Sequence, residues 1–448
     1  MKSSGKTGKI FIAVIVLVHI IFFLLAAHFK RIYMGDSYEY VYMAINIKER
    51  LLFYSANAAL PLMAKNFTLR PPVYSLFLLL VYVFTINNWV VIILQNLLSI
   101  FNILYCRKTL QLIGYNKKYD WVLLVLIVAY PAQFIFADTI APDILLQTFV
   151  LVYCRHFILL TKERTMRHAW ITIIALTLGI FTKPILILFI PVHVVMLLYV
   201  CIKLHASWRS FAPVIVPIAC ILLYDGWNYQ RTDKFHFTSI QPMNALLYNV
   251  RMYQEQALGR EAAKHYIDRE KAKMYGMPSF KEWYDYGNET SKQFLKEHFF
   301  SYAWFHIKSS FQFFIHPGKG ELDLFTGDLT YGRFFKNKDK RIMEVLKETP
   351  PSQWLSYMVA HPNTPAMFVV LFFNVLKVIG AVVFVFNRRI AWQYRSFLFI
   401  VLCYFALMTG PIANARYHLP VSLILIGCGA LGYQRLLQGK RNSTNITI

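Results

Sequence analysis

The chain has 448 residues, of which 57% are hydrophobic and 17% aromatic. Apolar runs of roughly 20 residues recur along it, which excludes an ordinary soluble protein and predicts an all-α, multi-pass membrane protein. The net charge of +24 would favour a nucleic-acid partner in a soluble chain. Here the basic residues cluster between apolar runs, so membrane orientation explains them and no nucleic acid is expected.

The first apolar run, residues 10–27, is too long for the core of a signal peptide, and no small-residue cleavage site follows it. We therefore predict an uncleaved first membrane helix. All six cysteines lie in apolar runs, which favours buried small side chains over a disulfide framework or a metal site. Further membrane helices are predicted at 89–106, 121–137, 143–161, 169–183, 185–202, 211–226, 366–386, 396–410 and 421–437.

The segment 70–86 begins with a Pro-Pro pair and is short for a span of about 20 residues. If it lies along the membrane surface, lysine and arginine gather in the connections on one side, as the positive-inside rule requires. If it spanned, every later connection would invert and the bias would disappear. We therefore predict an interfacial helix at 70–86, about ten spans, and both termini inside.

This topology divides the chain into four parts. Residues 1–226 form an N-terminal membrane module whose first outer loop is 28–88, and residues 227–365 form a large, mostly helical outer loop. Residues 366–437 form the C-terminal membrane helices, and 438–448 a cytoplasmic tail, of which we expect residues 439–448 to be disordered. The aromatic and basic stretch 294–318 is interpreted as interfacial, because an extra span there would invert later connections.

Charged residues in the outer connections stand out against the positive-inside bias. Ionisable groups cost roughly 2.5–3.5 kcal/mol at the centre of a membrane helix and less toward its end. Their repetition at one membrane face predicts a shared, water-filled site. The residues are Asp36, Glu39, Arg70, Asp138, Asp143, Lys183 and Arg416.

Each of these residues could also have a purely structural role. Asp36 could be solvated or cap the next helix, and Asp143 suits the start of a helix because of the dipole. Arg70 could extend to lipid headgroups. Lys183, before a proline, could bind carbonyls freed at a helix break, and Arg416 could be an interfacial anchor.

Three other residues raise narrower questions. Lys377 lies near the middle of a predicted span, and no role is assigned to it. His316 and His418 have no partner at the spacing of a common zinc motif, so a zinc site of that type is not predicted.

A set of short motifs is more specific than its members. The order is Asp-Ser-x-x-Tyr at 36–40, "RPP" at 70–72, "DTIAPD" at 138–143, "TKP" at 182–184 and Arg-Tyr-x-x-Pro at 416–420. This order resembles the GT-C glycosyltransferases, in particular bacterial lipid-phosphate-sugar transferases related to protein O-mannosyltransferases and the lipid A aminoarabinose transferase. The resemblance covers residues 1–200 and the C-terminal end; residues 227–365 match only in general character.

The resemblance implies a GT-C-like helix bundle with a catalytic acid in the first outer loop, which corresponds to Asp36. Asp143, with Asp138 nearby, takes the place of a second-loop acid. The donor phosphate would be bound by Arg416, Lys183, Arg70 and Tyr417, with Glu39 and Tyr40 as auxiliary residues. The chain departs from the family pattern in having Asp where Glu is frequent and in lacking a soluble C-terminal domain, so the acceptor stays open.

The implied reaction moves a sugar from a polyprenyl-phosphate donor to a glycan, lipid or protein acceptor. Asp36 would act as general base, and the basic residues would stabilise the leaving phosphate. A single carboxylate and one displacement imply inversion at the sugar. Some members of the superfamily use a divalent cation, so Mg²⁺ or Mn²⁺ is kept open as a cofactor without assigned ligands.

Two other functions stay open. A flippase for lipid-linked glycans would also contact lipid phosphates, although the inverted repeats typical of transporters are not seen. A glycan ligase or polymerase using a lipid pyrophosphate would favour basic residues in the large outer loop, and that loop is basic. The cysteine-free outer loops and the resemblance together predict a bacterial cytoplasmic membrane, with the active site facing outside.

Overall fold

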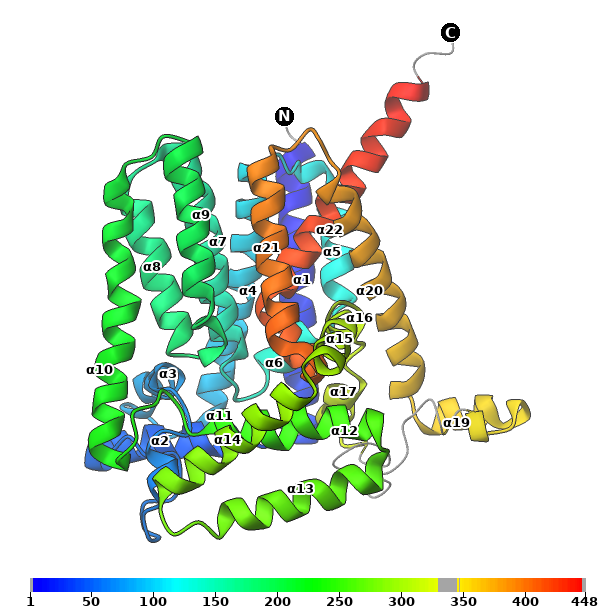
Figure 1. The fold of residues 1–448 in the computed structure, drawn as a ribbon. Helices are drawn as coiled ribbons and strands as arrows, with labels where there is room; N and C mark the ends of the chain where they lie inside the picture. The colour runs from blue at the N-terminus through cyan, green and yellow to red at the C-terminus, as the bar shows by residue number, and fades with distance from the viewer. Residues whose placement is uncertain (1–2, 329–344, 346, 445–448) are drawn as a thin grey trace.

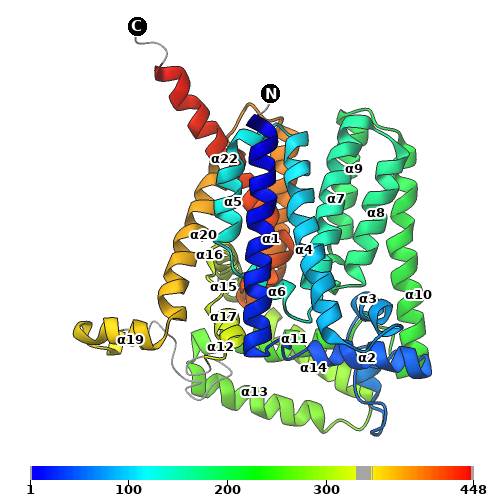
Figure 2. The same cartoon turned by 180° about the vertical axis from the view of Figure 1, so that it is seen from behind.

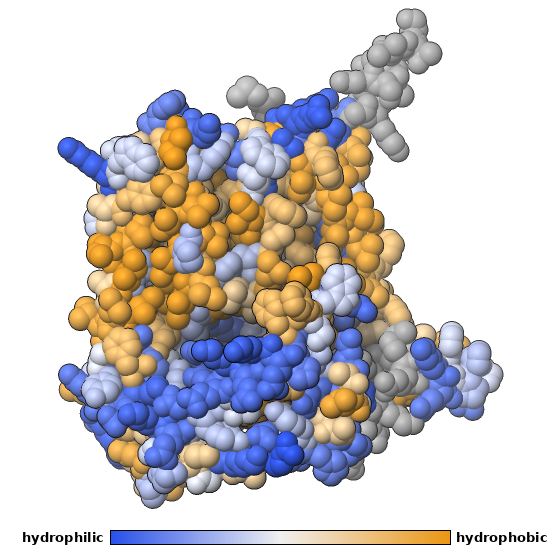
Figure 3. All heavy atoms as spheres, in the orientation of Figure 1, coloured by the Kyte–Doolittle hydropathy of each residue, from blue (hydrophilic) through white to orange (hydrophobic). Residues whose placement is uncertain are grey.

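The computed structural model describes residues 3–328, 345 and 347–444. Over these residues the chain consists of helices joined by loops, without a β-strand, which confirms the all-α prediction. Long helices lie side by side, and shorter helices form a layer across one end of them (Figure 1). Figure 3 shows a band of hydrophobic side chains over the long helices, with hydrophilic side chains at both ends. This surface is that of a multi-pass membrane protein.

Among the residues that the structure describes, seven helices are long and apolar enough to cross a membrane, and each corresponds to one predicted span. Two of them begin or end in a 3₁₀ turn. They are α1 (Ser3–Phe29), α4 (Asn88–Leu112), α7 (Asp143–Glu163), η4 with α10 (Trp208–Val214 and Ile215–Thr232), α20 (Asn363–Val385), α21 with η7 (Trp392–Thr409 and Gly410–Ile412) and α22 (Ala415–Thr444).

The other three predicted spans are short or interrupted. Residues 121–137 form α5 (Asp120–Val128) and α6 (Ala132–Ala137). Pro131 separates them, because it has no N–H to continue α5 and it disfavours helical geometry at the residue before it. Helices α8 (Met166–Ile180) and α9 (Phe189–Lys203) have 15 residues each, about 22 Å at 1.5 Å per residue, against a hydrocarbon core of about 30 Å. The count of ten spans therefore stays a prediction.

Helix α3 (Pro72–Tyr82) has 11 residues, about 16 Å at 1.5 Å per residue, so its length agrees with the non-spanning interpretation of 70–86. It lies beside α2 (Ser37–Arg50) at one end of the long helices (Figure 1). The two helices bury Tyr40 against Tyr74, with ring centroids 5.1 Å apart. This packing fixes the segment that carries Asp36.

Residues 227–365 contribute α11, α12, α13 and α14 to the same layer, on the side of α2 and α3 (Figure 2), and their helices α15 and α16 pack against α20, α21 and α22. Helix α10 first continues past its predicted end at residue 226 to Thr232, where Asp233 adopts a left-handed conformation and ends it. Residues 329–344 and 346 lie outside the described residues. The helices here are α11 (Ile240–Asn244), η5 (Ala245–Val250), α12 (Arg251–Ala257), α13 (Arg260–Tyr275), α14 (Phe280–Glu297), α15 (Phe299–Ser310), α16 (Gln312–Ile315), α17 (Lys319–Thr326), η6 (Pro351–Gln353) and α19 (Trp354–Ala360).

Helix α22 is the central helix of the bundle and packs against α5, α7, α20 and α21. It approaches α20 closely through glycines: a Cβ at Gly432 would lie 1.9 Å from the carbonyl oxygen of Gly380. Its first turn reaches the layer formed by α2 and α3, which positions Arg416 there. Its backbone continues as a helix to Thr444, and the expected disorder of residues 439–448 stays a prediction.

Candidate active site

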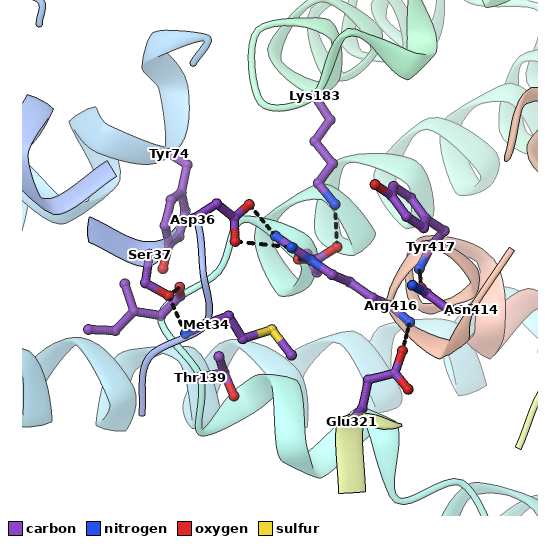
Figure 4. A network of polar contacts seen from close by, with 12 residues as sticks. Met34, Asp36, Ser37, Tyr74, Thr139, Lys183, Glu321, Asn414, Arg416 and Tyr417 are labelled. Carbon is purple, nitrogen blue, oxygen red and sulfur yellow. Dashed lines mark hydrogen bonds and ion pairs between the residues drawn. The ribbon is translucent and has the colours of Figure 1, made fainter. Parts of the chain in front are cut away.

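Six charged side chains meet where the loops after α1, α6 and α8 approach the first turn of α22. Figure 4 shows Asp36 and Lys183 pointing toward Arg416 from different elements. We call this group the ionic cluster. Its members are Asp36, Glu39, Arg70, Asp143, Lys183 and Arg416.

Arg416 is the centre of the ionic cluster. Its Nη1 and Nη2 donate to the two carboxylate oxygens of Asp36 at 3.0 and 2.7 Å, and its Nε donates to Asp143 Oδ2 at 3.0 Å. One guanidinium therefore joins two carboxylates that come from different loops. The fork of Arg416 with Asp36 is the bidentate geometry in which charge-assisted hydrogen bonds are strongest.

Asp143 is the first residue of α7 and its side chain is 0% exposed. Its second oxygen accepts a hydrogen bond from Lys183 Nζ at 2.5 Å. The helix N-terminus favours a negative charge here, as the sequence indicated, but the carboxylate also binds two cations. Burial lowers the pKa of Lys183, and the adjacent Asp143 opposes that shift.

Asp36 occupies the N-cap position of α2, yet its side chain makes no capping hydrogen bond. Its carboxylate binds Arg416 instead, and Arg70 Nη1 lies 3.8 Å from Asp36 Oδ2. Burial alone would raise the pKa of Asp36, but the guanidiniums of Arg416 and Arg70 outweigh it and hold the pKa well below its usual range. The side chain of Asp36 therefore pairs with Arg416 and does not cap α2.

Glu39 and Tyr40 surround Arg70. The Arg70 Nε donates to Glu39 Oε2, and its guanidinium lies over the Tyr40 ring, 5.4 Å from the centroid. Burial raises the pKa of Glu39, and the attraction of Arg70 offsets only part of this shift. Glu39 is thus a second, more basic carboxylate next to Asp36, and Tyr40 is a buried support for Arg70.

Hydrogen bonds to backbone carbonyls hold these loops together. Ser37 Oγ donates to the carbonyl of Ile140 at 2.6 Å, and the Ile140 N–H donates to the carbonyl of Ile32 at 2.8 Å. The Val73 N–H donates to the carbonyl of Phe181 at 3.1 Å. These contacts attach the loop after α1 to the loop after α6, and the start of α3 to the loop that carries Lys183.

Two other residues predicted for the site, Tyr417 and Asp138, are not members of the ionic cluster. Tyr417 lies next to Lys183, whose Nζ is 5.3 Å from the centroid of its ring. Asp138 lies apart from the cations of the ionic cluster and accepts a hydrogen bond from Asn96 Nδ2 at 2.7 Å. Burial raises the pKa of Asp138 to about 7, against the opposing hydrogen bond from Asn96. Asp143, and not Asp138, is therefore the acid of this loop that reaches Arg416.

Glu321 of α17 is a neighbour that the sequence did not indicate. Its Oε1 accepts the backbone N–H of Arg416 at 3.4 Å, and Asn414 Oδ1 accepts the backbone N–H of Tyr417 at 3.1 Å. Glu321 lies in residues 227–365, where no motif marked it. These two contacts satisfy N–H groups that the first turn of any helix leaves without a partner.

Lys377 of α20 is buried behind this region. Its Nζ donates to Asn374 Oδ1 at 3.0 Å and lies 4.6 Å from the centroid of the Tyr130 ring. The Tyr130 hydroxyl is 3.1 Å from the carbonyl oxygen of Ala415 and 3.1 Å from His418 Nδ1. Lys377 therefore contacts the support of α22 and lies outside the ionic cluster.

The residues of the ionic cluster do not form a ready metal site. Within the described parts of the chain, no group of three or more His, Cys, Asp or Glu side chains is placed to hold a metal ion. Asp36, Glu39 and Asp143 are each bound by arginine or lysine, so a dication would have to displace these cations.

Comparison with models of known protein families and with curated proteins found no match. The fold and the site therefore define the class: a multi-pass helical membrane protein with a buried ionic cluster at one end of its helices. In this cluster three cations face three carboxylates in a partly desolvated space. Such an arrangement can bind an anion through Arg416, Lys183 and Arg70 and can supply a carboxylate beside it.

Proposed function

We propose that the chain is a membrane glycosyltransferase that moves a sugar from a polyprenyl-phosphate donor to an acceptor hydroxyl, with Asp36 as general base. The observation that carries this proposal is the bridge that Arg416 makes between Asp36 and Asp143. It joins Asp36, Asp143 and Arg416, the two acids and the arginine that the resemblance to GT-C glycosyltransferases assigns to catalysis and donor binding. The position at the end of apolar helices suits a substrate with a lipid tail and a phosphate head.

In the proposed reaction the acceptor oxygen attacks the anomeric carbon and gives its proton to Asp36. The bond between that carbon and the phosphate oxygen breaks, and polyprenyl phosphate leaves with an additional negative charge. Arg416, Lys183 and Arg70 stabilise this charge. One displacement inverts the configuration of the sugar.

The ion pairs also support an order of binding. Both oxygens of Asp36 are bound to Arg416, and a carboxylate with a strongly lowered pKa is a weak base. A donor phosphate would compete with Asp36 for the Arg416 guanidinium. Binding of the donor would thus release Asp36 and raise its basicity before the acceptor is deprotonated.

The test uses the purified protein in lipid with polyprenyl-phosphate sugars, a panel of hexoses and pentoses carrying a radiolabel. The expected result is release of polyprenyl phosphate and transfer of label to added glycan, lipid or peptide acceptors. Movement of intact donor across the bilayer without bond cleavage would instead identify a flippase. Consumption of pyrophosphate-linked glycans only would identify a ligase or polymerase, and either outcome would overturn the proposal.

A binding measurement separates donor recognition from the choice of acceptor. Polyprenyl monophosphate, the proposed product, is expected to raise the melting temperature of the wild type and to have no such effect on Arg416→Gln. Arg209→Gln is the matched control, because Arg209 is an exposed cation of η4 outside the ionic cluster. Asp233→Asn is a second control, because Asp233 is an exposed acid outside the cluster and asparagine tolerates its left-handed conformation. Equal stabilisation of the wild type and Arg416→Gln would contradict the assigned phosphate contact.

A further inference from the structure

A groove runs along the membrane-facing side of α5, α20 and α22, separate from the ionic cluster. Its volume is about 740 Å³, within the roughly 300–1,000 Å³ of small-molecule sites. Helix α22 packs against both α5 and α20. The lining residues are Trp121, Val122, Val125, Leu126, Phe373, Leu376, Tyr433, Arg435, Leu436 and Leu437.

The two ends of the groove differ in polarity. Leu126, Phe373 and Leu376 give it an apolar part alongside α20, within the membrane-crossing length of that helix. Its other end carries Arg435, whose Nη1 donates to the carbonyl of Phe386 at 2.6 Å, just past the end of α20. The groove is thus apolar inside the membrane and charged where the helices leave it.

Further cations lie on the segments that contact α22 near the charged end. The loop between α4 and α5 is attached to α22 there, because the Asn116 N–H donates to Gln434 Oε1 at 2.9 Å. This loop presents Lys117 and Lys118, both exposed. Across α22, Arg389 Nη1 donates to Gln438 Oε1 at 3.3 Å.

These cations have no acid to neutralise them in the described part of the chain. The ion pairs found there include none of Lys117, Lys118, Arg389 and Arg435. The neighbouring acid, Asp120, is already bound by Arg107, whose Nε lies 2.9 Å from Asp120 Oδ1. The charged end of the groove therefore favours a negatively charged group.

We infer that the groove binds one anionic phospholipid, with an acyl chain along Leu126, Phe373 and Leu376 and its phosphate-bearing headgroup at Arg435 and Lys118. Hydrocarbon is the occupant that an apolar groove within a membrane favours, because water there would lack hydrogen-bond partners. An anionic headgroup gains an electrostatic attraction to each basic residue near it. A zwitterionic lipid offers the same chain without this gain.

This lipid site lies at the end of the bundle opposite the ionic cluster: α5 and the C-terminal part of α22 are at one end of the long helices, and α2 and α3 at the other (Figure 1). The inference is independent of the proposed glycosyltransferase activity, since it uses no residue of the ionic cluster. Failure of either one leaves the other intact.

The test is native mass spectrometry of the full chain purified in detergent and mixed with equal amounts of dioleoyl phosphatidylglycerol and dioleoyl phosphatidylcholine. The wild type is expected to retain one phosphatidylglycerol in preference to phosphatidylcholine. Arg435→Gln is expected to lower this preference about five-fold, the change that ~1 kcal/mol produces. Arg209→Gln is the control, because Arg209 is an exposed cation of η4, away from the groove.

A second variant tests the groove itself. Val125 lines the groove and is 44% exposed, so Val125→Trp is expected to fill it without disturbing the core and to lower retention of both lipids. The variant should elute at the same volume as the wild type in gel filtration, which shows that it is folded. Equal retention of the two lipids by the wild type would overturn the inference, as would an Arg435→Gln protein that behaves like Arg209→Gln, or unchanged retention by Val125→Trp.

Discussion

The substitution Arg416→Gln tests whether one guanidinium holds the ionic cluster together. It removes the hydrogen bonds to Asp36 at 3.0 and 2.7 Å and the one to Asp143 at 3.0 Å, and keeps a polar side chain. Loss of one partner of a buried ion pair costs about 3–5 kcal/mol. Lys183 still neutralises Asp143, and Arg70 still faces Asp36 at 3.8 Å, so we expect the lower end, about 3 kcal/mol.

The assay is the free energy of unfolding in detergent micelles, from denaturant titration followed by tryptophan fluorescence. A double-mutant cycle with Asp36→Asn isolates the pair, because contacting residues couple by about 0.5–3 kcal/mol. We expect the double variant to lose less stability than the sum of the two single losses. A loss below about 1 kcal/mol for Arg416→Gln, which is the range of exposed ion pairs, or strict additivity in the cycle, would refute the reasoning.

Three further outcomes are expected. The pKa of Asp36 is lowered in the folded protein, so its charge stabilises the fold above about pH 4 and this stabilisation is lost as the pH falls. The difference in melting temperature between the wild type and Asp36→Asn should therefore shrink below about pH 4. A difference that grows there contradicts this expectation. Lys377 has Asn374 as its hydrogen-bond partner and no carboxylate partner among the described residues, so Lys377→Met should leave the free energy of unfolding unchanged or raise it by about 1–4 kcal/mol. A clear loss of stability is the contrary result. The side chain of Glu39 is 30% exposed, so Glu39→Gln should change the free energy of unfolding by less than about 1 kcal/mol. A loss of stability as large as that of Arg416→Gln would contradict this expectation.

The long apolar runs carry most of what can be predicted about the fold, because a bilayer imposes a minimum helix length. This constraint identified the seven long helices. It does not predict the interruption within 121–137, where the apolar run continues through Tyr130 and Pro131 but the helix breaks between α5 and α6. The signal was present in the sequence, since proline ends helices, but the apolar composition of the run concealed it.

For the candidate site, the sequence predicted which side of the membrane its residues lie on, but not which of them are in contact. Charge bias placed Asp36 and Arg416 on the same side, but they are 380 residues apart, and their contact depends on how α22 is rotated in the bundle. Asp138 and Asp143 lie in one short loop and could not be distinguished from spacing. The start of α7 directs Asp143 to Arg416, whereas Asp138 contacts Asn96 of α4.

Glu321 shows a different limit. It belongs to a short helix among residues 227–365, whose position depends on packing against α1, α6 and α20 and on no local pattern. Its contact with the backbone of Arg416 follows from the three-dimensional arrangement alone. Residues of this kind become visible only when the helices are assembled.

The most direct test of the proposed function compares Asp36→Asn with the wild type in the transfer of labelled sugar from polyprenyl phosphate, with Asp233→Asn as the control. A general base contributes about 10²–10⁴-fold to the rate, so Asp36→Asn should lose at least about 100-fold in turnover, while the control keeps its activity. A folded Asp36→Asn protein that turns over the donor as fast as the wild type would contradict the catalytic role of Asp36.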